Sequence, residues 1–410
     1  MSPLLKRILL IALLVLVAIG IGFGLYYLFN RTGSLTGVGI IPTTPDGQLP
    51  GSGDRPTTTP SGNGTGTDTG TTLPVSGVTP ATPSPSFYQP TPVQKASSDY
   101  AIFPSLSTTG DVRYHNASDG RFYQIQPDGQ IRTLADQQFY NVQSVTWAKA
   151  ADKAVLEYPD GSKIIYNFDT KKQTTLPKHW EDFSFSPDGT QLAAKSMGLA
   201  PENRWLVTTK DDGSGTTLIE PLGDNGAQVQ VAWSPSRQTV AFAQTGQALG
   251  LDRREVLLVG LQGENFKSTV VEGLDFLPAW SPTGKKLLYS VDSARSDFKP
   301  ELWIVNAYGD EIGTNRQSLN INTWADKCSF GDDDTLFCAV PRDLPQGAGM
   351  ARDVAKDSYD DLYKIDLKTG AKVPVPLGDD YHINNISFDK ANNKVYFTDQ
   401  DQTGIFEAKL

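Results

Sequence analysis

One short pattern recurs along this chain and limits what it can fold into. An apolar residue, a small residue and an aromatic residue are followed by a turn and a second apolar run, as in "PAWSPTGKKLLYSV" at 278–291. Copies begin at Val145, Phe183, Val231, Pro278, Cys328 and Ile386, and a degenerate copy begins at Pro104. The spacings between them are 41, 38, 48, 47, 50 and 58 residues. Most copies continue with a third run and a weaker fourth run, which is the repeat of a β-propeller blade.

The sequence therefore predicts an all-β domain over 96–410, a seven-bladed β-propeller of four-stranded antiparallel blades. Two separate small antiparallel sheets could use the same hairpins, but seven copies of one pattern favour the propeller. Because side chains alternate along a strand, the small central residue should face the crowded channel. The aromatic residue should fill the space between neighbouring blades, and the Pro and Gly that follow set the turn.

The seventh unit supplies only three of its four strands, near 384–388, 394–398 and 404–409. An unpaired strand beside the first blade would leave the ring open and a row of backbone groups without partners. The segment 87–101 precedes the first unit and includes "VQKASSDYA". We predict that part of it pairs, antiparallel, with the strand ending at Lys409 and closes the ring.

The repeat resembles that of a known family. "FSFSPDGTQLAAKS" at 183–196, "PAWSPTGKKLLYSV" and the third run "LWIVNAYGD" are similar to the W-S-P-D-G-x-x-I-A-F repeat of TolB-type, WD-repeat-like β-propellers. The resemblance covers about 100–410. It departs in the first unit, which lacks the aromatic residue, and in the sixth, where Gly-Asp replaces Ser-Pro. It implies the propeller fold but little about activity, since propellers host enzymes, receptors and scaffolds. The helical N-terminal domain of TolB has no counterpart here.

Two different segments precede the propeller. Within 1–31, the stretch 8–29 contains no charged residue and is long enough to cross a bilayer. Lys6 and Arg7 precede it, which predicts a retained signal-anchor helix with its N-terminus inside the cell. Residues 32–95 are rich in Thr, Gly, Pro and Ser and predict a disordered linker. The propeller is thus expected on the extracytoplasmic side of a membrane.

Charge and composition limit the partners of the propeller. The part from 96 to 410 contains 43 acidic and 31 basic residues, a balance that disfavours binding to nucleic acid. The sequence carries no phosphate-binding glycine loop, no G-x-S-x-G elbow and no H-E-x-x-H motif. We therefore expect no small-molecule cofactor. The acidic run at 331–334 is interpreted as a solvated turn.

Few residues carry the signature of a chemical site. His115, His179 and His382 are isolated in the sequence, which favours structural roles. "DQDQTG" at 399–404 imitates the start of a calcium loop and makes Asp399, Asp401 and Thr403 a weak metal candidate. Position 12 of that loop is Leu410 rather than Glu, so an ordinary polar turn is the favoured interpretation.

Cys328 and Cys338 are the only cysteines of the chain. If their hairpin turns near Asp333, they fall opposite each other on adjacent strands, at a separation close to that of a disulfide. An extracytoplasmic location would favour their oxidation. Two buried free thiols remain the alternative.

The connections between second and third strands give the best functional signal. They are long in four consecutive units, at 197–203, 245–254, 292–300 and 341–360, and in a propeller they all emerge on one face. Function often resides on loops held by a rigid scaffold. The basic residues of these loops are the candidate binding residues: Arg253, Arg254, Arg295, Lys299, Arg342, Arg352 and Lys356.

Two functional classes follow from these observations. The favoured one is a non-catalytic, membrane-tethered module that binds a protein or a cell-envelope polymer through the loop-rich face. The alternative is a propeller enzyme that acts on a glycan or peptide at the mouth of the channel. An enzyme should place two carboxylates, or a His–carboxylate pair, on the inner strands or on these loops.

Overall fold

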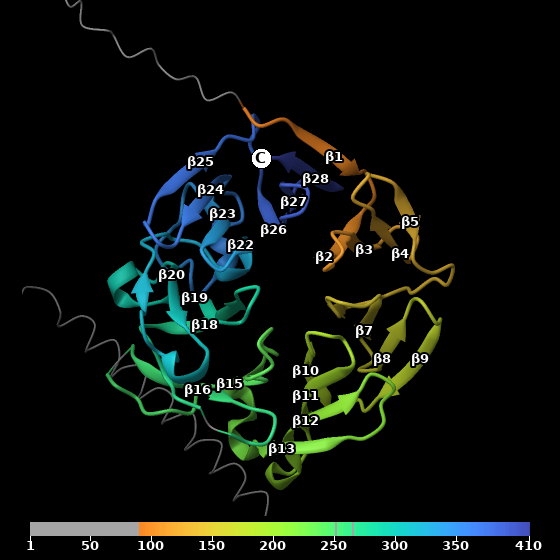
Figure 1. Cartoon of the computed structure of the whole chain (residues 1–410), viewed down its shortest axis with the longest axis vertical. Helices are drawn as coiled ribbons and strands as arrows, with labels where there is room; N and C mark the ends of the chain where they lie inside the picture. Colours follow the sequence, from red (N-terminus) through yellow and green to blue (C-terminus); the bar gives the residue numbers. More distant parts are fainter. Residues whose placement is uncertain (1–89, 251, 265) are drawn as a thin grey trace, which may run out of the picture. The chain divides into compact units, whose positions relative to one another are not determined.

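The computed structural model describes residues 90–410, except 251 and 265. Seven four-stranded antiparallel sheets are arranged around a central axis, as Figure 1 shows. The predicted seven-bladed propeller is confirmed. Within the described residues no helix is long and apolar enough to cross a membrane, and the predicted membrane helix at 8–29 lies outside them.

The strands of the first four blades follow the chain from the centre outwards. Blade 1 contains β2 (Ala101–Leu106), β3 (Val112–Asn116), β4 (Arg121–Ile125) and β5 (Ile131–Thr133). Blade 2 contains β6 (Ser144–Trp147), β7 (Lys153–Glu157), β8 (Lys163–Asn167) and β9 (Lys172–Leu176). Blade 3 contains β10 (Trp180–Phe185), β11 (Gln191–Met197), β12 (Arg204–Lys210) and β13 (Thr217–Pro221). Blade 4 contains β14 (Val229–Val231), β15 (Ala241–Ala243), β16 (Arg254–Val259) and β17 (Thr269–Val271).

Blades 5 and 6 follow the same order, and blade 7 differs. Blade 5 contains β18 (Leu274–Trp280), β19 (Lys286–Asp292), β20 (Glu301–Asn306) and β21 (Gln317–Ser318). Blade 6 contains β22 (Cys328–Asp332), β23 (Thr335–Pro341), β24 (Asp360–Asp366) and β25 (Lys372–Val375). Blade 7 combines β26 (Ile383–Asp389), β27 (Lys394–Asp399) and β28 (Ile405–Lys409) with β1 (Val93–Ser97) from the start of the domain. Short 3-10 helices occur in the connections: η1 (Pro201–Asn203), η2 (Gly223–Gln228), η3 (Ala294–Ser296), η4 (Gly309–Glu311), η5 (Ala325–Lys327) and η6 (Arg352–Ala355).

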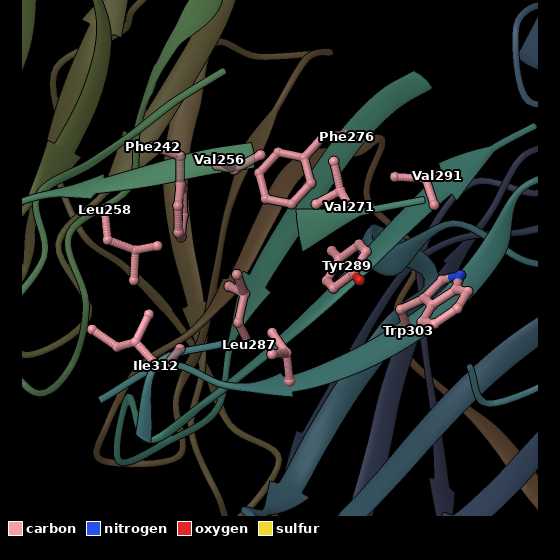
Figure 2. Close-up of a cluster of buried hydrophobic side chains, with 12 residues drawn as sticks. Phe242, Val256, Leu258, Val271, Phe276, Leu287, Tyr289, Val291, Trp303 and Ile312 are labelled. Carbon is pink, nitrogen blue, oxygen red and sulfur yellow. The ribbon is translucent and has the colours of Figure 1, made fainter. Parts of the chain in front are cut away.

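The repeated aromatic residue joins neighbouring blades, as predicted. Trp280 stacks on Phe242 of blade 4, with ring centroids 5.1 Å apart, and its Nε1 donates a hydrogen bond to the carbonyl of Ala232. Trp147 donates in the same way to Phe103 of blade 1. Figure 2 shows the apolar cluster between blades 4 and 5, in which Phe242 and Tyr289 come from opposite sheets and are fully buried.

The small residue before the aromatic has a role that the sequence did not reveal. The hydroxyl of Ser184 in blade 3 accepts a hydrogen bond from the backbone N–H of Trp233 in blade 4, at 2.9 Å. Ser329 of blade 6 accepts one from Phe388 of blade 7 in the same way. A serine at this position therefore links adjacent blades, in addition to fitting a crowded strand.

The turns between first and second strands form contacts from blade to blade on one face. Arg237 of blade 4 pairs with Asp188 of blade 3 at 2.8 Å. The run 331–334 forms a turn between β22 and β23, as predicted, and the side chains of Asp332 and Asp334 are partly exposed. Its Asp334 pairs with Lys286 of blade 5 at 2.8 Å, and its Asp332 pairs with Lys390 of blade 7 at 3.5 Å. The acidic turn of the sixth unit thus forms ion pairs with both neighbouring blades.

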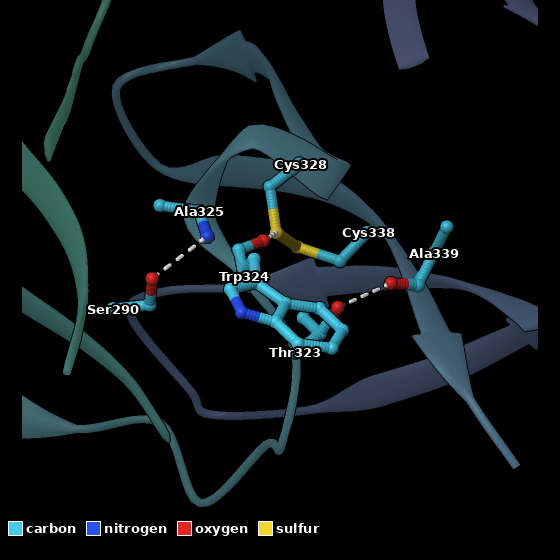
Figure 3. The surroundings of a disulfide bond; sticks show 7 residues. All are labelled: Ser290, Thr323, Trp324, Ala325, Cys328, Cys338 and Ala339. Atoms are coloured by element: carbon cyan, nitrogen blue, oxygen red, sulfur yellow. Dashed lines mark hydrogen bonds between the residues drawn. A yellow bond between two sulfur atoms is a disulfide. The ribbon is translucent and has the colours of Figure 1, made fainter. Parts of the chain in front are cut away.

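Cys328 and Cys338 form a disulfide within blade 6 (Figure 3). They lie directly opposite each other in β22 and β23, with their Cα atoms 4.1 Å apart. The connection that precedes β22 is fixed by two more contacts in Figure 3: Ala325 donates to Ser290 of blade 5, and Thr323 donates to Ala339. The disulfide therefore holds an inner hairpin at the junction of blades 5 and 6.

The ring closes through the predicted pairing of the two ends of the domain. Strand β1 is antiparallel to β28, with Val93 opposite Ala408 and Lys95 opposite Phe406. Figure 1 shows β1 at the outer edge of blade 7. The apolar side chain of Val93 packs against the cluster of buried residues in blades 6 and 7.

We expect deletion of residues 90–97 to lower the melting temperature of the whole protein by several degrees, because β28 would lose its outer partner. Thermal unfolding of the full chain measures the effect. Deletion of residues 60–67, which has the same length within the predicted linker, should leave the melting temperature unchanged. Equal melting temperatures for the two deletions would contradict closure by β1.

Candidate functional site

The four long connections lie together on one face of the propeller. They join the second and third strands of blades 3 to 6, and three of them contain η1, η3 and η6. The connections that lead from each blade to the next emerge on the same side, since strands alternate in direction. We call this side the insertion face. The sequence prediction that the long loops share one face is confirmed by this topology.

The insertions of blades 5 and 6 bind to each other. The N–H of Gly347 donates to the carbonyl of Asp297 at 2.9 Å, and that of Gly349 donates to Phe298 at 2.8 Å. Asp297 and Phe298 are consecutive non-glycine residues with φ values of 55° and 53°. Two adjacent residues in this sparsely populated region carry backbone strain that the surrounding contacts must hold.

Most of the predicted basic residues already bind carboxylates. Arg253 pairs with Glu272, Arg295 with Glu301, and Arg352 with Asp326. Arg295 also lies over the ring of Trp303, and Arg352 over that of Trp324. Arg254 is the first residue of β16 and so belongs to a strand rather than to a loop.

The remaining predicted residues border cavities. Arg342 binds both Asp361 and Asp380, at 2.9 and 2.6 Å, and borders two cavities of about 430 and 370 Å³. Lys299 borders the second of these. Arg352 and Lys356 border a third cavity, between blades 6 and 7. The structure therefore brings Arg352 and Lys356 together and leaves Arg253 and Arg295 in separate ion pairs.

The cavity between blades 6 and 7 holds the most chemically varied group of side chains on the insertion face. Its volume is about 230 Å³. It is lined by Trp324, Lys327, Arg352, Asp353, Ala355, Lys356, Ser358, Asp360, His382, Ile383, Asn384 and Gln400. Charged and amide groups dominate this lining, which differs from the apolar lining typical of sites for small organic cofactors.

A buried ion pair forms the base of this cavity. Lys327 of η5 and Asp360 of β24 lie 2.6 Å apart, and both side chains are buried. The second carboxylate oxygen of Asp360 accepts a hydrogen bond from the N–H of Ile383 in blade 7. Burial lowers the pKa of Lys327 and raises the pKa of Asp360, while each charge partly offsets this effect on the other. The pair thus ties blade 6 to blade 7.

His382 forms a His–carboxylate pair at the edge of the same cavity. Its Nδ1 lies 2.5 Å from the carboxylate of Asp401, and its ring stacks on Tyr359 with centroids 4.2 Å apart. Its Nε2 is buried and makes no hydrogen bond within the described residues. His382 is isolated in the sequence, but the fold gives it a carboxylate partner. The partner lies 19 residues away and is reached only through the fold, so no local motif could indicate it.

His115 and the calcium candidate have structural partners, and His179 is exposed. His115 is buried, with Nε2 bound to the carbonyl of Phe139, and burial lowers its pKa. Asp399 accepts hydrogen bonds from the backbone N–H groups of His382, Asp401 and Gln402. Asp399 and Asp401 thus serve the turn after β27. No group of three or more His, Cys, Asp or Glu residues suited to a metal occurs among residues 90–410 as described.

Large apolar side chains are exposed beside the cavity. Met350, Val354 and Tyr359 of the blade 6 insertion are 60%, 52% and 43% exposed. Leu199 and Leu249, in the insertions of blades 3 and 4, are exposed as well. Sequence reasoning selected the basic residues of these loops and missed the apolar ones, whose exposure depends on how the loop folds.

Comparison with known proteins gives information about the fold of the chain and none about its function. No protein family and no curated protein matches the sequence. The β-propeller domain of Cps50 (Swd1) from Myceliophteria thermophila has a TM-score of 0.52 at 12% identity, over 78% of this chain and 99% of that one. Oligogalacturonate lyase from Vibrio parahaemolyticus has a TM-score of 0.52 at 14% identity, over 77% and 93%. Hydrazine synthase from Kuenenia stuttgartiensis has a TM-score of 0.51 at 12% identity, over 75% and 94%.

These similarities agree with the β-propeller fold that the seven sheets define. At such low identities they show a common fold, and the similar structures include both a propeller domain and enzymes. Because one fold supports many functions, the activity has to be argued from the insertion face itself.

The Lys327–Asp360 pair yields a testable prediction. Replacing Lys327 with Met should lower the free energy of unfolding by about 3–5 kcal/mol, because it leaves the Asp360 carboxylate buried without a positively charged partner. Urea unfolding followed by tryptophan fluorescence measures this loss. Replacing Lys267, which forms an exposed ion pair with Asp310, should leave stability nearly unchanged. A similarly small loss for both variants would contradict the role given to the buried pair.

Proposed function

We propose that this protein is a membrane-tethered, extracytoplasmic β-propeller that binds a protein or a cell-envelope polymer without catalysis, as a TolB-like scaffold. The observation that carries the proposal is the blade 6 insertion. It exposes Met350, Val354 and Tyr359 directly beside a cavity lined by charged and amide groups. Exposed apolar residues bordered by polar groups are typical of interaction sites.

The character of the insertion face suits a large ligand. Its arginines are held in place by carboxylates and aromatic rings, as in the contact of Arg352 with both Asp326 and Trp324. Side chains fixed in this way lose little conformational entropy when a partner binds. The mixed charges give a surface that can match a specific polar partner, whereas a uniformly basic surface would favour nucleic acid.

Two features support the proposed location outside the cytoplasm. The uncharged stretch 8–29 follows Lys6 and Arg7, which is the arrangement of a signal anchor. The disulfide between Cys328 and Cys338 is the kind of bond that persists in oxidising compartments. The predicted linker that precedes β1 would let the propeller reach partners away from the membrane.

The His382–Asp401 pair favours a second candidate, an enzyme that acts on a glycan or peptide. A carboxylate on Nδ1 orients an imidazole so that Nε2 can accept a proton, as a general base does. In this structure Nε2 is buried and the ring is covered by Tyr359, so a substrate would have to displace that ring. Hydrolysis or elimination that disappears in H382A but not in Y308D would establish the enzyme.

The binding proposal predicts where crosslinks form. A photo-crosslinking residue at position 354 should give a discrete crosslinked species in native membranes, and the same residue at position 308 should not. Tyr308 is 47% exposed but lies between third and fourth strands, on the opposite side of the propeller. The purified double variant M350D/V354D should lose binding to the identified partner at least tenfold. Equal crosslinking from both positions would refute a specific insertion face.

The proposed topology can be tested separately. Protease added to intact cells or spheroplasts should digest the propeller and leave a short membrane-bound fragment, because the positive residues precede the apolar stretch. Immunoblotting with antibodies against each end of the chain detects the two products. Full protection of the chain before lysis would place the propeller in the cytoplasm.

A further inference from the structure

Four aspartates are buried in the described part of the chain, and three have full sets of partners. Asp360 binds Lys327 and the backbone of Ile383. Asp389 and Asp399 each accept hydrogen bonds from groups in the turn that follows them. The fourth is Asp292, which is 1% exposed. Neither of its carboxylate oxygens has a hydrogen-bond partner within the described residues.

Asp292 lies among other carboxylates. It ends β19 opposite Leu274 in β18, and the next residue of β18, Asp275, has its carboxyl beside it. Asp252, in the insertion of blade 4, adds a weaker negative charge. Three basic groups on the neighbouring elements are bound elsewhere: Arg253 to Glu272, Arg295 to Glu301 and Lys327 to Asp360. No ion pair within the described residues includes Asp292.

Asp292 is buried and the exposed Asp275 lies beside it, so burial and the adjacent negative charge both favour the protonated form of Asp292. Burial is the largest influence on Asp292, and the charge of Asp275 adds to it; together they raise the pKa of Asp292 to about 6. The protonated carboxyl of Asp292 can then donate a hydrogen bond to Asp275. This arrangement satisfies both groups without a cation.

The side chain of Asp292 lies directly beneath the blade 6 insertion. Gly349 packs on the Asp292 side chain so closely that a Cβ atom there would lie 2.4 Å from the Cβ of Asp292. The same glycine donates its N–H to Phe298, in the loop that follows Asp292. The insertion that carries Met350, Val354 and Tyr359 is therefore packed directly on Asp292, the residue that holds the proton.

We propose that Asp292 and Asp275 form a proton-dependent latch for the blade 6 insertion. When Asp292 is protonated, the two carboxyl groups together carry a single negative charge, and the insertion packs over Asp292. As the pH rises, Asp292 gives its proton to solvent, and the two carboxylates repel each other and draw in water. The contact of Gly349 is then lost, and the insertion moves away from blade 5.

The latch rests on the proposed function in one respect: the segment that it releases carries the proposed binding surface. The sign of the effect follows from the protonation state. Because the packed state binds the proton more tightly than the released state, packing is favoured at acidic pH and is lost as pH rises through about 6.

Distance measurements between two spin labels test the latch without any ligand. Labels at V354C, in the insertion, and at I131C, in β5 of blade 1, would be placed in the full-length protein in nanodiscs. The distribution of distances should be narrow at pH 5 and broader or shifted at pH 8, with half of the change near pH 6. D292N should give the narrow distribution at both values. D353N, which removes an exposed carboxyl from the same insertion, should respond to pH like the parent protein.

Two further measurements, with the D275N variant and with calcium or EDTA, distinguish the possible outcomes. D275N removes the neighbouring charge, so its transition should move to lower pH even if D292N folds poorly. Calcium or EDTA should not alter the parent protein at pH 8. An unchanged distribution between pH 5 and 8, or the same response in D292N, would overturn the latch. Narrowing by calcium in the parent but not in D292N would show that the pair binds a cation instead. Because no partner is present, none of these outcomes depends on the proposed binding function.

Discussion

The pairing of β1 with β28 is the constraint on which the rest of the structure depends. Each blade of a propeller packs against two neighbours, so the apolar clusters between blades are complete only when the ring is closed. The last blade takes its outer strand from the beginning of the domain, which joins the two ends by backbone hydrogen bonds. With the ring closed, every blade has two neighbours, and the aromatic residues between blades and the ion pairs of the turns connect blades around the ring.

On this closed ring, the two faces differ in how their polar groups are used. On one face, short turns bind from blade to blade, as Asp332 and Asp334 do. On the insertion face, the buried ion pair of Lys327 with Asp360 holds blade 6 against blade 7. Burying a charged group costs desolvation energy, which is compensated only where the group has a counter-ion and hydrogen bonds. Asp292 is the exception, and it lies under the most extensive insertion.

The repeated pattern was sufficient to predict seven blades, the strand order and the closing strand. These features follow from local alternation and from counting strands, which a sequence displays directly. The opposed cysteines could also be predicted, because they belong to one hairpin. The His382–Asp401 pair could not, since both residues lie in connections outside the strands. The Asp275–Asp292 pair could not either, since an irregularity in β18 shifts the register of that hairpin. Asp275, for example, has a φ of 49° at an irregularity in β18 that no residue pattern indicated.

The closing pair also determines when the domain can finish folding. Val93 is among the first residues of the propeller to be synthesised, and its partner Ala408 is among the last. Nearly the whole domain must therefore leave the ribosome before its final strand finds a partner. Contacts between residues so distant in sequence form slowly, and unpaired strand edges favour aggregation. Blades 1 to 6 can form in order during synthesis, but blade 7 remains open at its edge until the end, which makes this edge the natural place for a chaperone to act.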